Sequence, residues 1–322
     1  MKAIQISSTG APDVLTMVEI PIPEPAQGEA LIEIARSGVN FIDIYYREGR
    51  YPAHLPLVLG QEAAGTVVGL GEGVEHFKVG DRVAWRGGFG TYAEYAAVSS
   101  GKLVAIPEGI TFDQAAAVMT QGLTAHYLTH SAYPIKSGDN VLIHAGAGGT
   151  GRLVIQMAKM RGAYVLTTVS SEKKAEIARE AGADEVIMYT EESFNKRARV
   201  VTSDKGLAVV YDSVGRSTFE ESLTCLSRRG VLVLYGASSG PVPAFDLFRL
   251  AQAGSLYVTR PVLNDYVATP SELNDRARDI FHWIHQGRLA LRITHTFSLS
   301  EARIAHKALQ SRESSGKLLL RT

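Results

Sequence analysis

The sequence predicts an α/β protein in which a doubly wound parallel sheet is combined with a β-rich, barrel-like domain. Three observations lead to this expectation. Short strand-like runs crowd residues 1 to about 120, and apolar β-branched runs then alternate with helix-length segments. The 322 residues are enough for two domains of ordinary size.

The β-rich domain is expected to contain short strands separated by turn residues. The expected strands are 1–6, 15–20, 30–37, 64–70, 82–85, 92–98 and 103–106. Prolines at 21, 23 and 25 and the glycine-rich segment 87–90 interrupt the pattern between them. Many short strands at close spacing are typical of a barrel-like fold.

Strands and helices alternate after about residue 120. The expected strands are 140–145, 163–169, 185–188, 207–211, 230–235 and 255–259. The expected helices between them are 150–161, 172–181, 191–200 and 217–226. This alternation predicts βαβ units, and therefore a parallel sheet with helices on both faces.

The C-terminal tail is expected to form helices 271–285 and 300–311, with Ser300 as the N-cap of the second, and a last strand at 317–320. These elements cannot form a core of their own, so we expect them to return to the β-rich domain. The predicted domains are therefore 1–122 plus 263–322, and 123–262.

Composition excludes several classes of protein. Lysine plus arginine and aspartate plus glutamate both total 33, and this balance disfavours nucleic-acid and polybasic membrane binders. The single cysteine, Cys225, excludes an internal disulfide and any zinc site with two cysteines from this chain. Its helical context predicts a buried apolar side chain. No apolar run approaches a membrane span and the N-terminus reads directly into a strand, so we expect a cytoplasmic protein.

The first strand of the alternating region is followed by Gly146, Gly148 and Gly151, which satisfy the pattern G-x-G-x-x-G. Between a strand and a helix, these glycines permit a tight turn, close approach of the backbone to a pyrophosphate, and close packing of the helix. The helix N-terminus offers N–H groups and a partial positive charge to the phosphates. The sequence therefore predicts a Rossmann dinucleotide site, with Gly149 and Thr150 at the same turn.

The end of the next strand distinguishes between the two nicotinamide dinucleotides. An NAD site usually carries an acidic residue there for the ribose 2′-hydroxyl. This chain has Ser170 and Ser171 instead, followed by Lys173 and Lys174. Hydroxyl and ammonium groups suit a 2′-phosphate, so we expect NADPH. The alternative is that the two lysines only form a solvated helix face.

Several local runs resemble one family along the whole chain. They are VNFIDIY at 39–45, GQEAAG at 60–65, GLT at 122–124, VYDSVG at 210–215 and GSLYVTRP at 254–261. Together they resemble the zinc-independent quinone oxidoreductases, the zeta-crystallin-like branch of the medium-chain dehydrogenase/reductase superfamily, with the bacterial NADPH:quinone reductases as the nearest group. The resemblance implies a GroES-like catalytic domain at 1–122 plus 263–322 and a Rossmann NADP-binding domain at 123–262.

The positions of the metal ligands in the zinc-dependent relatives are occupied by other residue types. By resemblance, Asn40 replaces the first cysteine, Gln61 replaces the histidine of the G-H-E motif, and Thr120 lies near the third ligand. Amide and hydroxyl groups are poor zinc ligands beside thiolate and imidazole. We therefore expect no metal. His126 and His130, one helical turn apart, lack an evident third ligand, and a helix near the domain junction is the better interpretation.

The resemblance also implies a set of site residues. The expected catalytic residues are Asn40, Asp43, Tyr45 and Tyr51. The expected cofactor-binding residues are Phe41, Ile42, Thr124, Tyr127, Gly146, Gly148, Gly149, Thr150, Gly151, Ser170, Lys174, Tyr189, Ser213, Gly236, Ser238, Ser239, Arg260 and Arg312. Simpler alternatives are a structural hydrogen-bonding role for Asp43 and ordinary packing for the tyrosines.

The expected activity is the NADPH-dependent reduction of quinones, by hydride or stepwise electron transfer. Two alternatives stay open: reduction of the C=C bond of an enone or alkenal, and a non-enzymatic NADPH-binding or structural role. The apolar strand expected at 255–259 would lie at a sheet edge, and such edges are usually paired or covered. The resemblance implies a homodimer, and we expect it to form through this strand.

Overall fold

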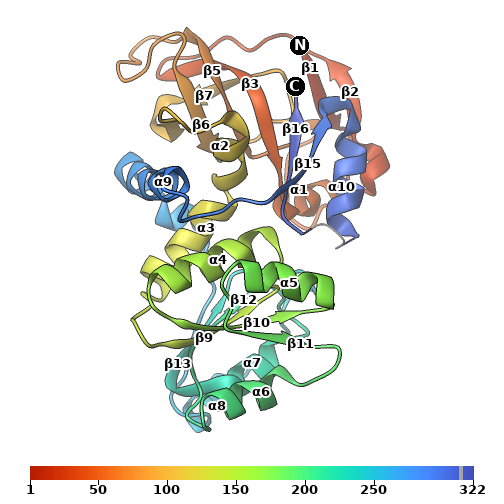
Figure 1. The fold of residues 1–322 in the computed structure, drawn as a ribbon. Coiled ribbons are helices and arrows are strands. Elements are labelled where there is room, and N and C mark those ends of the chain that lie inside the picture. The colour runs from red at the N-terminus through yellow and green to blue at the C-terminus, as the bar shows by residue number, and fades with distance from the viewer. Residues whose placement is uncertain (312–314) are drawn as a thin grey trace. The chain divides into compact units, whose positions relative to one another are not determined.

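The computed structural model describes residues 1–311 and 315–322. The chain divides into two compact units, which are drawn with their elements labelled in Figure 1. Unit 1 comprises Met1–Leu123 and Val267–Thr322, and unit 2 comprises Thr124–Tyr266. Arg312, which the sequence places at the cofactor, lies outside the described residues.

Unit 1 is built on a seven-stranded sheet with the order β15-β16-β3-β5-β6-β8, in which β7 also pairs with β3. These strands are β3 (Glu29–Val39), β5 (Glu62–Leu70), β6 (Arg82–Arg86), β7 (Tyr95–Ser99), β8 (Leu103–Ala105), β15 (Ile293–Ser298) and β16 (Lys317–Arg321). A smaller sheet has the order β2-β1-β4, formed by β1 (Lys2–Ile6), β2 (Thr16–Glu19) and β4 (Leu57–Val58). Because β16 pairs with β3, the C-terminal tail completes the main sheet of unit 1.

The helices of unit 1 cover these sheets. They are α1 (Phe41–Arg47), α2 (Phe112–Val118), α9 (Pro270–His285) and α10 (Ala302–Gln310), and the unit boundary falls inside α3 (Gln121–Tyr127). Short 3₁₀ turns occur at Pro12–Val14, Ser100–Lys102 and Leu299–Glu301. The buried core beneath α1 and α10 includes Ile44, Leu309 and Leu318. Burial of such aliphatic side chains is what fixes both helices to the sheet.

Unit 2 is a six-stranded parallel sheet with the order β11-β10-β9-β12-β13-β14. Its strands are β9 (Asn140–His144), β10 (Tyr164–Val169), β11 (Glu185–Met188), β12 (Leu207–Asp212), β13 (Leu226–Leu234) and β14 (Tyr257–Thr259). Its helices are α4 (Gly149–Met160), α5 (Glu172–Glu180), α6 (Phe194–Val201), α7 (Phe219–Cys225) and α8 (Phe248–Gln252), with a π-helical turn at Leu128–Ala132 and a 3₁₀ turn at Leu263–Tyr266. In Figure 1, α4 and α5 cover one face of the sheet, and α6, α7 and α8 lie on the other. The fold expected for this region, a doubly wound parallel sheet, is confirmed.

The sequence-based element boundaries needed several corrections. The helix α1 was not predicted, because its segment is rich in aromatic and β-branched residues that favour strands. Ser300 is not a helix N-cap: Ser298 precedes a 3₁₀ turn, with its N–H 2.8 Å from Glu301 Oε2, and α10 begins only at Ala302. The expectation that Cys225 is buried is confirmed.

Candidate active site

The glycine turn of unit 2 joins β9 to α4. A Cβ atom on Gly146 would collide with the Thr167 side chain, and one on Gly151 would collide with the carbonyl oxygen of Ala145. Glycine is therefore required at both positions for the helix to pack this close to the strand. Gly148 is the N-cap of the 12-residue helix α4, with φ −72° and ψ 161°. The N–H groups of its first turn have no intrahelical acceptor, so the turn offers donors to an anion.

Hydroxyl and ammonium groups meet at the end of the adjacent strand, β10. Ser170 follows β10 directly, and Lys174 Nζ donates a hydrogen bond to Ser170 Oγ at 3.2 Å. Tyr189 follows β11 and is 54% exposed. Gly149 and Thr150 are the first two residues of α4, which follows the neighbouring strand β9. The structure therefore brings Ser170 and Lys174 together, at the strand end that the sequence predicted for the 2′-phosphate.

The loop after β12 is organised by a buried carboxylate that sequence reasoning missed. Asp212 Oδ1 accepts the N–H groups of Val214 at 2.7 Å and Gly215 at 3.0 Å. Its Oδ2 accepts the Thr218 hydroxyl at 2.7 Å. The sequence did contain a signal for Asp212, because it is an acidic residue at the carboxyl end of a predicted parallel strand. Ligands of such sheets bind at that edge.

The loops after β12 and β13 are hydrogen-bonded to each other. Ser238 N donates to Ser213 O at 3.2 Å, and Ser239 Oγ donates to Val214 O at 2.7 Å. A Cβ atom on Gly236 would collide with the Ser213 carbonyl oxygen. The predicted residues at 213, 236, 238 and 239 therefore lie in one pair of contacting loops at the carboxyl edge of the sheet.

Three further residues of unit 2 were predicted to contact the cofactor: Thr124, Tyr127 and Arg260. The ring of Tyr127 is buried and stacks on Tyr266, with centroids 4.4 Å apart and an interplanar angle of 11°. Thr124 lies one turn earlier on α3 and is half-buried. Arg260 is exposed, and its Nη1 donates to Leu234 O at 3.1 Å. The buried ring of Tyr127 therefore packs within its own unit.

An aromatic cluster lies at α1. It is made of Phe41, Tyr45 and Tyr46 of this helix together with Tyr51 and Phe89. Tyr51 lies edge-on to Tyr45 and Tyr46, with ring centroids 5.6 Å and 5.5 Å away. Phe89 lies edge-on to Tyr46 at 4.8 Å. Phe41 and Tyr51 are 37% and 38% exposed. The sequence predicted Tyr45 and Tyr51 as site residues but did not indicate Phe89. Phe89 lies in the glycine-rich segment 87–90, which is distant from α1 in the sequence.

Asn40 and Asp43, at the start of α1, are buried. Asp43 Oδ2 accepts the backbone N–H of Asn40 at 2.8 Å, which satisfies a free donor at the start of α1. The Asn40 side chain faces a charged pair: its Nδ2 donates to Glu62 Oε1 at 2.6 Å, and Lys317 Nζ donates to its Oδ1 at 2.8 Å. Ile42, between them in sequence, is half-buried.

A chain of hydrogen bonds links the two ends of the inward face of α1. Arg47 Nη1 donates to His306 Nδ1 at 3.1 Å, so the neutral ring carries its proton on Nε2. That nitrogen lies 3.2 Å from the Tyr92 hydroxyl, which donates to Asp43 Oδ2 at 3.0 Å. Burial, together with the Arg47 charge, lowers the pKa of His306 to about 3. Burial raises the pKa of Asp43 to about 7.

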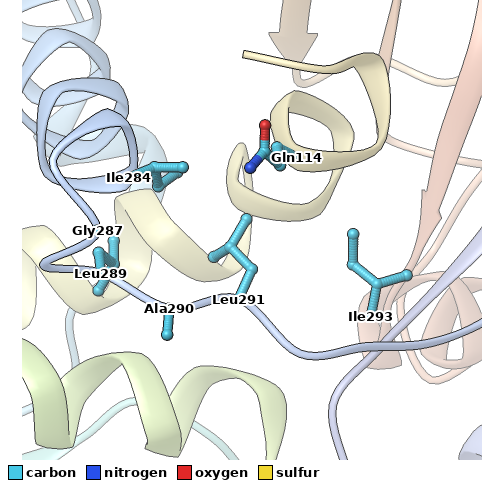
Figure 2. A pocket seen from close by; sticks show the side chains of 7 residues that line it. All are labelled: Gln114, Ile284, Gly287, Leu289, Ala290, Leu291 and Ile293. Atoms are coloured by element: carbon cyan, nitrogen blue, oxygen red, sulfur yellow. The ribbon is translucent and has the colours of Figure 1, made fainter. Parts of the chain in front are cut away.

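A cavity of about 500 Å³ lies within unit 1 and is shown in Figure 2. It is lined by Gln114, Ile284, Gly287, Leu289, Ala290, Leu291 and Ile293. The Gln114 amide is the polar side chain among them, and its Oε1 accepts the Thr111 N–H at 2.9 Å as part of the cap of α2. Among the described residues, those that line this cavity include none of the predicted site residues and no titratable group.

Two features are absent from residues 1–311 and 315–322. These residues contain no group of three or more His, Cys, Asp or Glu side chains placed to hold a metal ion. The helices formed by them include none that is long and apolar enough to cross a membrane.

Comparisons with known proteins match both parts of the chain. The family model described as alcohol dehydrogenase GroES-like domain matches residues 26–108. The model described as zinc-binding dehydrogenase matches residues 149–275. Both descriptions name dehydrogenases.

Relatives that match over their whole length identify the family more narrowly than the two family models do. Quinone oxidoreductase from Pseudomonas aeruginosa is 45% identical over 321 residues, which cover 99% of each chain. The solved structure of Escherichia coli quinone oxidoreductase in complex with NADPH covers 100% of both chains, with a TM-score of 0.98 and 42% identity. A 2-haloacrylate reductase from Burkholderia is 37% identical and covers 99% of this chain and 98% of its own. The chain therefore belongs to the quinone oxidoreductase family.

Proposed function

We propose that the protein catalyses the reduction of quinones by NADPH without zinc. The observation that carries this proposal is the full-length likeness to quinone oxidoreductases, one of which was solved with NADPH bound. The likeness extends over both units.

The residues of unit 2 fit NADPH. The glycine turn leaves room for a pyrophosphate against the first turn of α4, whose N–H groups would bind it. Ser170 Oγ and Lys174 Nζ, 3.2 Å apart, would hold the 2′-phosphate. We further assign cofactor contacts to Phe41, Ile42, Thr124, Tyr127, Tyr189, Ser213, Gly236, Ser238, Ser239, Arg260 and Arg312.

When bound, NADPH supplies a hydride, which a quinone accepts together with one proton to become a hydroquinone. The aromatic cluster suits such a substrate, because a flat apolar ring stacks on or against aromatic faces. We assign Tyr51 to the substrate, as a stacking face or a phenol donor, and Tyr45 to its orientation. Asn40 and Asp43 are buried, and we assign them to holding the start of α1.

Zinc independence rests on the chemistry of the donor groups. Asn40, Gln61 and Thr120 present an amide or hydroxyl where the zinc-dependent relatives have metal ligands. The carboxylate beside them, Glu62, already pairs with the Lys317 ammonium. A second cation at this carboxylate would be repelled by the first.

We also propose a cytoplasmic homodimer, in which unit 1 acts as the catalytic domain and unit 2 as the NADP-binding domain. The dimer is supported by β14, the edge strand of the unit 2 sheet. Its residues Tyr257 and Val258 are 60% and 37% exposed, and Leu247 and Phe248 of the same unit are 74% and 65% exposed. An apolar edge strand would pair with its two-fold mate into one continuous sheet.

The test is a side-by-side assay of NADPH oxidation with 1,4-benzoquinone, 9,10-phenanthrenequinone and a 2-alkenal. We expect turnover with both quinones and slower turnover with the alkenal. The 2-haloacrylate reductase relative makes C=C reduction the competing function, and faster turnover of the alkenal would favour it. Tight NADPH binding without turnover of any acceptor would favour a non-enzymatic role.

A further inference from the structure

A charged pair is buried inside unit 1 at the first residues of β16 and β5. The side chains of Lys317 and Glu62 are 3% and 0% exposed, and their ammonium and carboxylate groups are in direct contact. Removing two charges from water costs several kcal/mol per ion, and further hydrogen bonds are needed to offset this cost. Lys317 Nζ therefore also donates to Asn40 Oδ1 at 2.8 Å.

The pair fixes which way the Asn40 amide points. The amide oxygen faces the ammonium group, and the amide nitrogen donates to Glu62 Oε1 at 2.6 Å. The opposite rotamer would place the oxygen against the carboxylate and the NH₂ group against the ammonium. Both contacts would then be repulsive, and a buried site screens such repulsion weakly. Two opposite charges thus select one orientation of an otherwise ambiguous amide.

The same pair joins segments that are far apart in the sequence. Glu62 Oε2 accepts the backbone N–H of Thr120 at 2.6 Å, and a Cβ atom on Gly38 would collide with the Glu62 side chain. Asn40 is the N-cap residue of α1, and its N–H is held by Asp43. The pair therefore contacts Asn40, the N-cap residue of α1, and α1 is the helix that carries three residues of the aromatic cluster.

We propose that Lys317 is a positioning residue for quinone reduction, which acts by holding the Asn40 amide and the start of α1 through its buried pair with Glu62. This inference rests on the proposed function, since the aromatic cluster carried by α1 is where we place the quinone. It assigns to Lys317 a role that the sequence did not indicate: an internal cation beside Asn40 and Glu62 that orients groups and does not touch the substrate.

The test separates positioning from stability by a double-mutant cycle. K317M and E62Q each leave one buried charge without its partner, so we expect both to lower the urea midpoint of unfolding. E62Q/K317M removes both charges, and we expect its midpoint to return close to that of the wild type. Its kcat for 9,10-phenanthrenequinone should still be at least tenfold lower, with the Kd for NADPH unchanged, because the two charges that select the orientation of the Asn40 amide are gone.

The matched control removes a charged pair of the same kind at the surface. Lys307 and Asp13 lie 3.4 Å apart and are 60% and 72% exposed. We expect D13N/K307M to keep the wild-type kcat. A double variant E62Q/K317M whose kcat recovers to within twofold of the wild type along with its stability would overturn the proposal, since the pair would then only stabilise the fold.

A second readout does not depend on activity. In protein labelled with ¹⁵N at asparagine, the Asn40 Nδ2 hydrogens should exchange slowly with water in the wild type, and their resonances should move in E62Q/K317M. Fast exchange in the wild type itself, which needs no variant to fold, would overturn the proposal. If wild-type protein oxidises no NADPH with any quinone, the proposed function fails, while this measurement still decides whether Lys317 fixes the Asn40 amide.

Discussion

Burial shifts the pKa values of two residues of unit 1 in opposite directions, and this predicts an unusual pH dependence of the free energy of unfolding. Burial raises the pKa of Asp43 from an ordinary value of 3.8 to about 7. Burial and the Arg47 charge lower the pKa of His306 from an ordinary value of 6.5 to about 3. Between about pH 4 and pH 6.5, the folded protein therefore has neutral Asp43 and neutral His306, whereas the unfolded chain has both groups charged.

The two effects on the free energy of unfolding have opposite signs. Because the folded pKa of Asp43 is raised, its contribution to stability is complete below about pH 4 and is lost as the pH rises through about 7. Because the folded pKa of His306 is lowered, its contribution is complete above about pH 6.5 and is lost as the pH falls toward about 3. Both states bind one proton between these limits, so the two slopes cancel in the wild type.

Substitution of either residue should expose the slope of the other. At about 1.4 kcal/mol per pH unit, D43N should lose about 2 kcal/mol of stability relative to the wild type between about pH 7 and pH 5. H306Q should gain about 2 kcal/mol relative to the wild type between about pH 8 and pH 5. The other carboxylates affect all three proteins equally, so the differences from the wild type isolate this pair.

The assay is urea unfolding followed by tryptophan fluorescence at several pH values. Both tryptophans of the chain, Trp85 and Trp283, belong to unit 1, so the signal reports the unit that contains Asp43 and His306. Parallel stability curves for the wild type, D43N and H306Q across this pH range would refute the reasoning, because neither residue would then change its proton between the folded and unfolded states.

Three further predictions concern the other parts of the molecule. Gly151→Ala should destabilise unit 2 by about 1–3 kcal/mol in scanning calorimetry and abolish NADPH binding, because its Cβ meets the Ala145 carbonyl oxygen; unchanged stability would contradict the tight turn. Lys174→Ala should weaken NADPH binding about tenfold to hundredfold by the loss of one charge-assisted hydrogen bond, and leave NADH binding unchanged. Equal losses for both dinucleotides in titration calorimetry would show that Lys174 does not contact the 2′-phosphate. Tyr257→Lys on β14 should convert the dimer to a monomer in light scattering, whereas Val79→Lys, at an equally exposed position of unit 1, should not. A monomeric wild type would remove the dimer proposal altogether.

The fold of unit 2 was predictable because its information is local. Each strand and the helix after it carry their own periodicity, and the glycine turn at 146–151 lies between the two elements that it joins. The same locality brought Ser170 and Lys174 to one strand end, since they are four residues apart: Ser170 follows β10, and Lys174 lies on the first turn of α5.

The interior of unit 1 was not predictable in this way. Lys317 and Glu62 are 255 residues apart in the sequence, and His306 is 214 residues from Tyr92. No periodic pattern marks such pairs, and isolated charged residues in a sequence are usually exposed. The helix α1 was missed because its aromatic and β-branched residues favour strands, and the partner of its Arg47, His306, is 259 residues away in the sequence.

The central claim is that this chain transfers reducing equivalents from NADPH to a quinone without a metal. It is tested most directly by mixing purified protein, treated with a chelator and analysed for zinc, with NADPH and one equivalent of 9,10-phenanthrenequinone in a stopped-flow instrument. We expect one NADPH to be oxidised for each quinone, in protein that contains no stoichiometric zinc. Oxidation no faster than in the absence of protein, or activity that disappears with the chelator and returns with one zinc ion per chain, would contradict the account.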